Sequence, residues 1–124
     1  MSEHDPAILD ASVLDELRAS VEGDRSFVVE LIEAYLADGA AHVDAINAAL
    51  RGDDAEALVR PAHTLKSSSA TLGAMRLAGT ARELEMIGRS GSLAEAGEAA
   101  GRVAEEWRAT SDALRAWISS DSGA

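Results

Sequence analysis

Apolar residues recur at every third or fourth position along almost the whole chain, and this spacing restricts the fold more than any other feature. It puts apolar side chains on one face of an α-helix, whereas the period-two alternation of half-buried strands is missing. The 124 residues suit one domain with a single core. The sequence therefore predicts an all-α domain.

Capping residues and glycines divide this pattern into five expected helices. Their ranges are Asp10 to Gly23, Asp24 to Gly52, Asp53 to Leu72, Ala74 to Arg89, and Ser92 through at least Trp117. A capping box of Ser92 and Glu95 is expected to open the last helix. We expect an antiparallel up-down four-helix bundle with the first helix as a short extra N-terminal element. The whole helical bundle is expected to cover residues 10–119, between a flexible N-terminal tail at 1–9 and a C-terminal tail at 120–124.

Composition excludes several classes of protein. The chain has no cysteine, so it forms neither a disulfide nor a thiolate metal site. No apolar run approaches the roughly 20 residues that span a bilayer, and the start lacks the layout of a signal peptide. We therefore expect a cytoplasmic protein without membrane contact. A formal net charge of −11 argues against a nucleic-acid partner.

One segment departs from this acidic character. Residues 57–82 contain no Asp or Glu and carry Arg60, Lys66, Arg76 and Arg82. Burial explains part of such a gap, because buried helix faces exclude acids as well. The segment still predicts a locally positive field, and Lys66 within it is the only lysine of the chain.

His63 lies in the third expected helix, opposite its core face. At about 100° per residue, the centre of that core face lies roughly 150° to 160° from His63. The core face comprises Leu58, Ala62, Leu65, Ser69 and Leu72. The outward face comprises, besides His63, Glu56, Val59, Arg60, Lys66, Ser67 and Ala70. His63 is therefore expected to face solvent, with small neighbours that leave a partner room to approach.

The outward position excludes several uses of a histidine. A core histidine or a haem ligand would point inward, and a metal site would need further ligands where Lys66 and Ser67 stand. Two interpretations remain: an incidental surface histidine, or a nucleophile with a free lone pair on one ring nitrogen. Spacing alone does not decide between them. A phosphorylated imidazole would gain roughly two negative charges, which Lys66 could stabilise.

The fourth expected helix carries a second group of charges. Arg82, Glu85 and Arg89 share one of its faces at spacings of three and four, as a surface strip of ion pairs would. If the third and fourth helices form a hairpin, Glu85 and Arg89 come close to the level of His63. Pro61, two residues before His63, either bends the third helix or begins a second helical segment.

Two motifs of this chain resemble those of the histidine-containing phosphotransfer (HPt) domains of multistep phosphorelays. Residues 62–74 read AHTLKSSSATLGA and resemble the pattern A-H-x-L-K-G-x-x-x-x-[LIV]-G. The family's next helix ends in L-E-x-x-G-R, which here is Leu84-Glu85-Met86-Ile87-Gly88-Arg89. Residues 27–36 also look like the family's second helix, so the likeness covers most of residues 10–117. Ser67 stands where the family usually has glycine.

The resemblance implies that His63 accepts and donates a phosphoryl group with electrostatic support from Lys66. The exchange would be with an aspartate of a response-regulator receiver domain, whose acidic pocket supplies Mg²⁺, so this chain needs no metal or other cofactor. A sensor or hybrid histidine kinase is the other implied partner. The chain would be a monomeric phosphocarrier rather than an enzyme. The residues expected to border the docking site are Val59, Arg60, Ser67, Ala70, Glu85 and Arg89.

Three other functions would place different demands on this chain. An adaptor that binds receiver or kinase domains without transfer would have no use for the pair of His63 and Lys66. A cofactor- or metal-binding bundle would need convergent inward ligands. A kinase-derived dimerisation module would need a longer hairpin and an adjoining ATPase domain. The intact pair therefore favours phosphotransfer.

Overall fold

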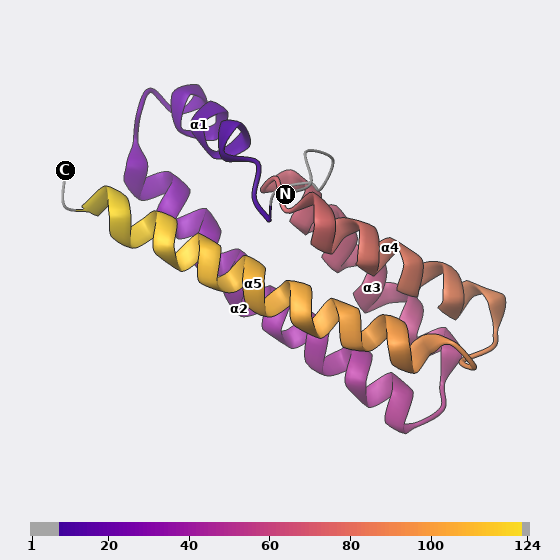
Figure 1. The fold of residues 1–124 in the computed structure, drawn as a ribbon. Helices are drawn as coiled ribbons and strands as arrows, with labels where there is room; N and C mark the ends of the chain where they lie inside the picture. Colours follow the sequence, from indigo (N-terminus) through magenta and orange to yellow (C-terminus); the bar gives the residue numbers. More distant parts are fainter. Residues whose placement is uncertain (1–7, 123–124) are drawn as a thin grey trace, which may run out of the picture.

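The computed structural model describes residues 8–122, apart from the side chains of residue 11 and residues 120–122 (Figure 1). Within that range lie α1 (Ala11–Ser20), α2 (Arg25–Arg51), α3 (Ala55–Thr71), α4 (Met75–Ser90) and α5 (Ala96–Ser122), and no strand. The all-α prediction is confirmed. The expected domain limits stay a prediction: residues 1–7 and 123–124 of the two tails lie outside the described range, and α5 continues into the expected C-terminal tail.

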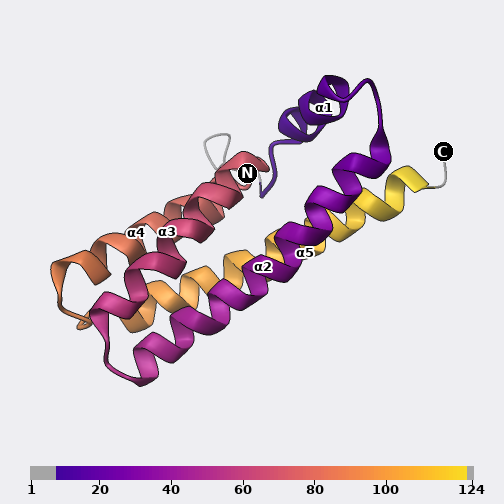
Figure 2. The same cartoon turned by 180° about the vertical axis from the view of Figure 1, so that it is seen from behind.

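α2 and α5 are the longest helices and lie side by side, while α3 and α4 form a shorter hairpin against them (Figure 1 and Figure 2). α3 contacts α2, α4 contacts α5, and α2 contacts α5. The core between the four helices includes Ile46 of α2, Leu58 and Leu65 of α3, Leu84 of α4 and Val103 of α5. The hairpin is thus held along its inner side, which leaves its outer side to solvent.

α1 covers the end of α2 and α5 that extends past the hairpin (Figure 1). A second core cluster there joins Leu14 of α1 to Val28 of α2 and Leu114 of α5. The N–H of Asp10 donates to the carbonyl of Gly73 at 2.9 Å, which ties the start of α1 to the turn between α3 and α4. Gly73 has a left-handed φ of +82°, and a Cβ there would lie 3.0 Å from the Asp10 carbonyl oxygen. This turn therefore requires glycine.

The helix N-termini match the predicted caps at α1 and α2 and differ from them at α3 and α5. The carboxylates of Asp10 and Asp24 accept N–H groups in the first turns of α1 and α2, as predicted. α3 instead begins behind Asp54, whose carboxylate accepts the N–H of Ala57 at 3.0 Å. The prediction of Asp53 as the cap is wrong, because a cap needs an extended backbone and Asp53 has a left-handed φ of 51°.

α5 begins at Ala96, one turn later than a capping box of Ser92 and Glu95 would place it. The Oγ of Ser92 accepts the N–H of Ala94 at 3.3 Å, and the N–H of Ala96 donates to the carbonyl of Leu93 at 3.1 Å. The capping side chain is thus used inside the connection between α4 and α5. The prediction of a capping box is wrong for this reason.

α3 runs without interruption through Pro61, which is buried inside it. Proline lacks an N–H, so one backbone hydrogen bond of the helix is missing there. Of the two interpretations of Pro61, the start of a second helical segment is wrong. His63 therefore belongs to one continuous helix with the residues on both sides of it.

Candidate functional site

α3 has one buried and one exposed face, as its periodicity predicts. The core-face residues are at most 2% exposed: Leu58, Ala62, Leu65, Ser69 and Leu72. His63 lies on the other face, and 51% of its side chain is exposed. The expectation that His63 faces solvent is confirmed.

α3 and α4 approach each other closely at Gly88. A Cβ on Gly88 would lie 3.0 Å from Cγ2 of Val59 and 3.1 Å from the carbonyl oxygen of Ala55. Few real side chains pack so tightly, so a larger residue here would push the two helices apart. Glu85 precedes Gly88 by one turn of α4, and the close approach brings it beside His63 of α3.

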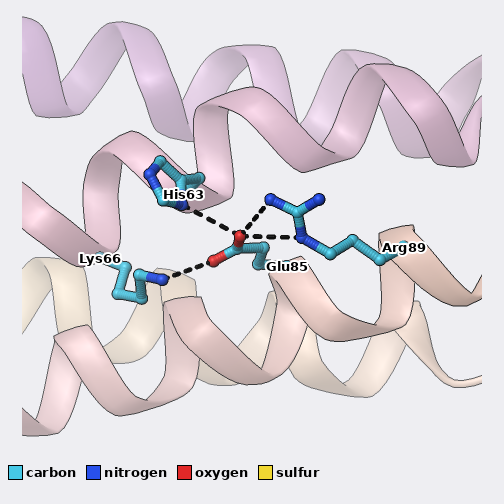
Figure 3. Close-up of polar contacts among 4 residues, drawn as sticks. All are labelled: His63, Lys66, Glu85 and Arg89. Atoms are coloured by element: carbon cyan, nitrogen blue, oxygen red, sulfur yellow. Dashed lines mark hydrogen bonds and ion pairs between the residues drawn. The ribbon is translucent and has the colours of Figure 1, made fainter.

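His63 and Lys66 of α3 and Arg89 of α4 all contact the carboxylate of Glu85, so four side chains from two helices meet (Figure 3). We call these four residues the Glu85 cluster. Oε2 of Glu85 lies 3.0 Å from Nδ1 of His63 and accepts from Nε and Nη2 of Arg89 at 3.0 and 2.8 Å. Oε1 lies 2.9 Å from Nζ of Lys66. One carboxylate thus connects the exposed histidine to two cations.

Glu85 is ionised although it is buried. Only 6% of its side chain is exposed, and burial alone would favour the neutral acid. Lys66 has the largest effect, and together with Arg89 and His63 it lowers the pKa of Glu85 to about 2. A carboxylate can only accept hydrogen bonds. The hydrogen shared between Oε2 and His63 therefore belongs to Nδ1.

This contact determines which nitrogen of His63 can react. In a neutral imidazole with its hydrogen on Nδ1, the free lone pair is on Nε2. Among the described residues none makes a hydrogen bond to Nε2, and the ring is half exposed. The site therefore presents one nucleophilic nitrogen to solvent while Glu85 holds the ring from behind.

The other residues expected around the site lie as follows. Arg60, Ser67 and Ala70 are exposed on the outer side of α3, and Val59 is half-buried against Gly88. Arg89 is 60% exposed. These side chains form a rim around His63, and their part in docking stays a prediction.

Sequence reasoning missed that Glu85 is buried and that Lys66 pairs with it. The spacing of Glu85 with Arg82 and Arg89 is compatible with a surface strip of ion pairs. Of these three residues, however, only Arg82 and Arg89 are exposed. The difference arises because α3 lies over this part of α4. Gly88 is the signal that could have revealed it, since a glycine inside a helix often marks the close approach of another backbone.

The serines after Lys66 have different surroundings. Ser69 is fully buried, and its Oγ lies 2.7 Å from the hydroxyl oxygen of Tyr35 on α2. Burial raises the pKa of Tyr35 to about 12, so its hydroxyl remains neutral and can donate. Ser67 is exposed beside His63. Ser69 thus belongs to the core, and Ser67 to the surface that a partner would meet.

Within residues 8–122, no group of three or more His, Cys, Asp or Glu side chains is arranged to hold a metal ion. None of the helices in that range combines the length and apolar character needed to cross a membrane.

This chain is similar to known proteins both in its family and in its structure. The model of the Hpt domain family matches residues 30–117. The crystal structure of histidine-containing phosphotransfer protein B (HptB) from Pseudomonas aeruginosa PAO1 has a TM-score of 0.80 and 30% sequence identity to this chain. That match covers 87% of this chain and 91% of the HptB chain. The search of curated protein sequences finds no match.

Proposed function

The chain belongs to the Hpt domain family, and we propose that it carries its phosphoryl group on Nε2 of His63. As a member of this family it is a histidine phosphotransfer protein of phosphorelays, which works with response regulators and histidine kinases. It is a phosphocarrier rather than an enzyme. The finer proposal concerns which atoms of this chain take part and how.

The contact between His63 Nδ1 and buried Glu85 is the observation that carries this proposal. At 3.0 Å it keeps the hydrogen on Nδ1 and the lone pair on the exposed Nε2. His42 offers no comparable arrangement, since neither a hydrogen bond nor an ion pair orients its ring among residues 8–122. An incidental surface histidine would have no need of a buried, ionised partner.

The phosphoryl group passes between the receiver's aspartate and His63 without any movement of protons. The Nε2 lone pair attacks the phosphorus of a receiver's aspartyl phosphate, the P–O bond breaks, and the aspartate carboxylate leaves with the electron pair. The ring is then phosphorylated on Nε2 and protonated on Nδ1, with a positive charge that faces Glu85. In the reverse direction a carboxylate attacks phosphorus, the P–N bond breaks, and the pair returns to Nε2. Nδ1 therefore keeps its proton in both directions and donates it to the carboxylate of Glu85.

Positive charge that stabilises the transferring phosphoryl group comes from both this chain and the receiver. Lys66 supplies a positive charge one turn from His63 on α3, and electrostatic stabilisation of the equatorial oxygens is the main requirement of phosphoryl transfer. The receiver's acidic pocket is expected to bring Mg²⁺, because Mg²⁺ binds carboxylates together with phosphate oxygens. This chain contributes no cofactor of its own.

The docking surface is the rim around His63. Arg60, Lys66 and Arg89 surround it in an otherwise acidic protein, which suits an acidic receiver pocket. The remaining rim residues are small or half-buried: Val59, Ser67 and Ala70. Ser67 in the usual glycine position adds only a hydroxymethyl group, so we expect docking to tolerate it. Glu85 is not part of this rim, because it is buried and contacts His63 from the protein side.

Three broader properties complete the proposal. We classify the fold as an antiparallel up-down four-helix bundle, α2 to α5, with α1 as an extra N-terminal helix. We expect a monomer, which light scattering would test. We expect the protein in the cytoplasm, which fractionation of cells that produce the tagged chain would test.

The experiment incubates the protein with a phosphorylated receiver, or with a kinase and receiver pair. We expect an acid-labile, alkali-stable phosphate on the wild type and on His42→Gln, and none on His63→Gln. His42 is the matched control because it is a partly exposed histidine on α2 that takes no part in the hydrogen bonds and ion pairs of the Glu85 cluster. Absence of labelling across a broad panel of receivers would contradict the proposal. Binding to receivers without labelling would support an adaptor instead.

A further inference from the structure

The two oxygens of Glu85 have different partners. Oε2 is shared by Nδ1 of His63 and two nitrogens of Arg89. Oε1 has Lys66 alone, at 2.9 Å. Figure 3 shows that Lys66 and Arg89 reach the carboxylate from opposite sides. The two cations can therefore leave or stay independently of each other.

Lys66 is the cation that can leave. Its ammonium is a point charge on a long, freely rotating chain, and 29% of its side chain is exposed. A buried carboxylate stripped of every cation would be strongly disfavoured. Arg89, however, makes two hydrogen bonds to Oε2 and remains when Lys66 moves away. Glu85 itself cannot follow Lys66, because it is buried and belongs to the other helix.

A phosphoryl group on Nε2 would attract Lys66 toward His63. Residues three apart on a helix are surface neighbours, so the Lys66 side chain can reach either Glu85 or a group on the exposed edge of the His63 ring. A phosphoryl group carries roughly two negative charges, against one on Glu85, which Arg89 already shares. The stronger and less satisfied anion then lies on the solvent side of the cluster.

We propose that Glu85 is a positioning residue that holds Lys66 as its counterion in the resting protein and releases it to the phosphoryl group of phosphorylated His63. This inference rests on the proposed function. The contacts of Oε2 do not change, because Nδ1 keeps its hydrogen before and after transfer. Before transfer, Lys66, Arg89 and the carboxylate of Glu85 together carry one net positive charge. Afterwards the phosphoryl charge is balanced by that excess and by the positive ring.

Lys66 can be observed directly, because it is the only lysine of the chain. Protein labelled with ¹⁵N-lysine therefore gives a single Nζ signal in NMR spectra. We compare the resting protein with protein phosphorylated chemically by phosphoramidate, so that no receiver is needed. Glu85→Gln removes the resting counterion. Glu83→Gln is the matched control, since Glu83 is an exposed residue of α4 that pairs with Arg102.

In the resting wild type and in Glu83→Gln we expect a protected Nζ signal. In resting Glu85→Gln we expect that signal to be lost to rapid exchange with water. After phosphorylation, the Nζ signals of wild type and Glu85→Gln are expected at the same new chemical shift, because Lys66 contacts the phosphoryl group in both proteins. An Nζ signal that stays unchanged when His63 is phosphorylated would overturn the proposal, even if Glu85→Gln failed to fold.

The two proposals can fail separately in this experiment. ³¹P signals and the mass of the protein, compared with those of His63→Gln, report whether His63 carries phosphate, which tests the proposed function. The Nζ signal of the phosphorylated fraction reports where Lys66 lies, which tests the exchange. Phosphorylated His63 with Lys66 still on Glu85 would leave the proposed function intact and refute this inference alone.

Discussion

Gly88→Ala is expected to weaken both the fold and the site, because α3 and α4 have no room for a methyl group where they meet. The new Cβ would lie 3.0 Å from Cγ2 of Val59 and 3.1 Å from the carbonyl oxygen of Ala55. A side-chain methyl can turn aside, but the carbonyl oxygen is part of the α3 backbone. α4 must therefore move away from α3, and Glu85 moves with it relative to His63.

Two effects of opposite sign determine the magnitude. Alanine in a helix is favoured over glycine by about 1 kcal/mol, while overpacking a close contact costs about 1 to 3 kcal/mol. The backbone contact puts Gly88→Ala near the upper end of that cost, so we expect a net loss of about 1 to 2 kcal/mol. Gly79→Ala is the matched control on the same helix, because a Cβ there meets nothing within 4 Å. It is expected to stabilise by about 0.5 to 1 kcal/mol.

Urea unfolding of the two variants measures this difference as opposite shifts of the midpoint at a constant slope. Phosphoryl transfer from a receiver gives the second readout, and we expect it to slow in Gly88→Ala and to stay unchanged in Gly79→Ala. If both variants were stabilised to the same extent, α3 and α4 would not be in close contact at Gly88. The physical explanation for the position of Glu85 would then be refuted.

Three further predictions concern stability. Ionised Glu85, with its pKa lowered from 4.5 to about 2, stabilises the fold above about pH 4.5 by at most about 3 kcal/mol, and this contribution is lost as pH falls toward 2. The difference in unfolding free energy between wild type and Glu85→Gln should shrink over that window, and a difference independent of pH would contradict it. Asp54→Ala should lower the unfolding free energy by about 1 kcal/mol, whereas Asp53→Gly should not lower it, since glycine suits the left-handed φ of Asp53; equal losses in urea unfolding would restore Asp53 as the cap. Tyr35→Phe should cost about 1 to 2 kcal/mol because it leaves the buried Oγ of Ser69 without its partner, and thermal unfolding that matches the wild type would show that this hydrogen bond does not stabilise the fold.

The fold could be predicted from the sequence because local patterns determine most of it. Helical spacing identifies the helices and the core face of α3, and aspartates with extended backbones mark the starts of α1 and α2. Two boundaries could not be predicted in this way. Asp53 and Asp54 are adjacent and chemically identical, so only the backbone of the preceding turn decides which of them caps α3. Ser92, the expected cap of α5, is used inside the connection instead.

The sequence predicts which residues meet in the Glu85 cluster but not the contacts that they make there. The wheel of α3 places His63 outward beside Lys66. The expected hairpin of the third and fourth helices and the resemblance to HPt domains both bring Glu85 and Arg89 close to the level of His63. A helical wheel describes one helix at a time, however. The burial of Glu85 depends on how closely α4 approaches α3 at Gly88, which is a property of the pair. The contact between Lys66 and Glu85 joins two helices and follows from the same approach.

Phosphorylated protein labelled with ¹⁵N-histidine provides the most direct test of the central claim. Long-range ¹H–¹⁵N spectra with ³¹P coupling identify the nitrogen that carries phosphorus and the nitrogen that carries hydrogen. We predict phosphorus on Nε2 of His63 and hydrogen on Nδ1, before and after transfer. Phosphorus on Nδ1, or on His42, would contradict the claim that Glu85 orients His63 for transfer.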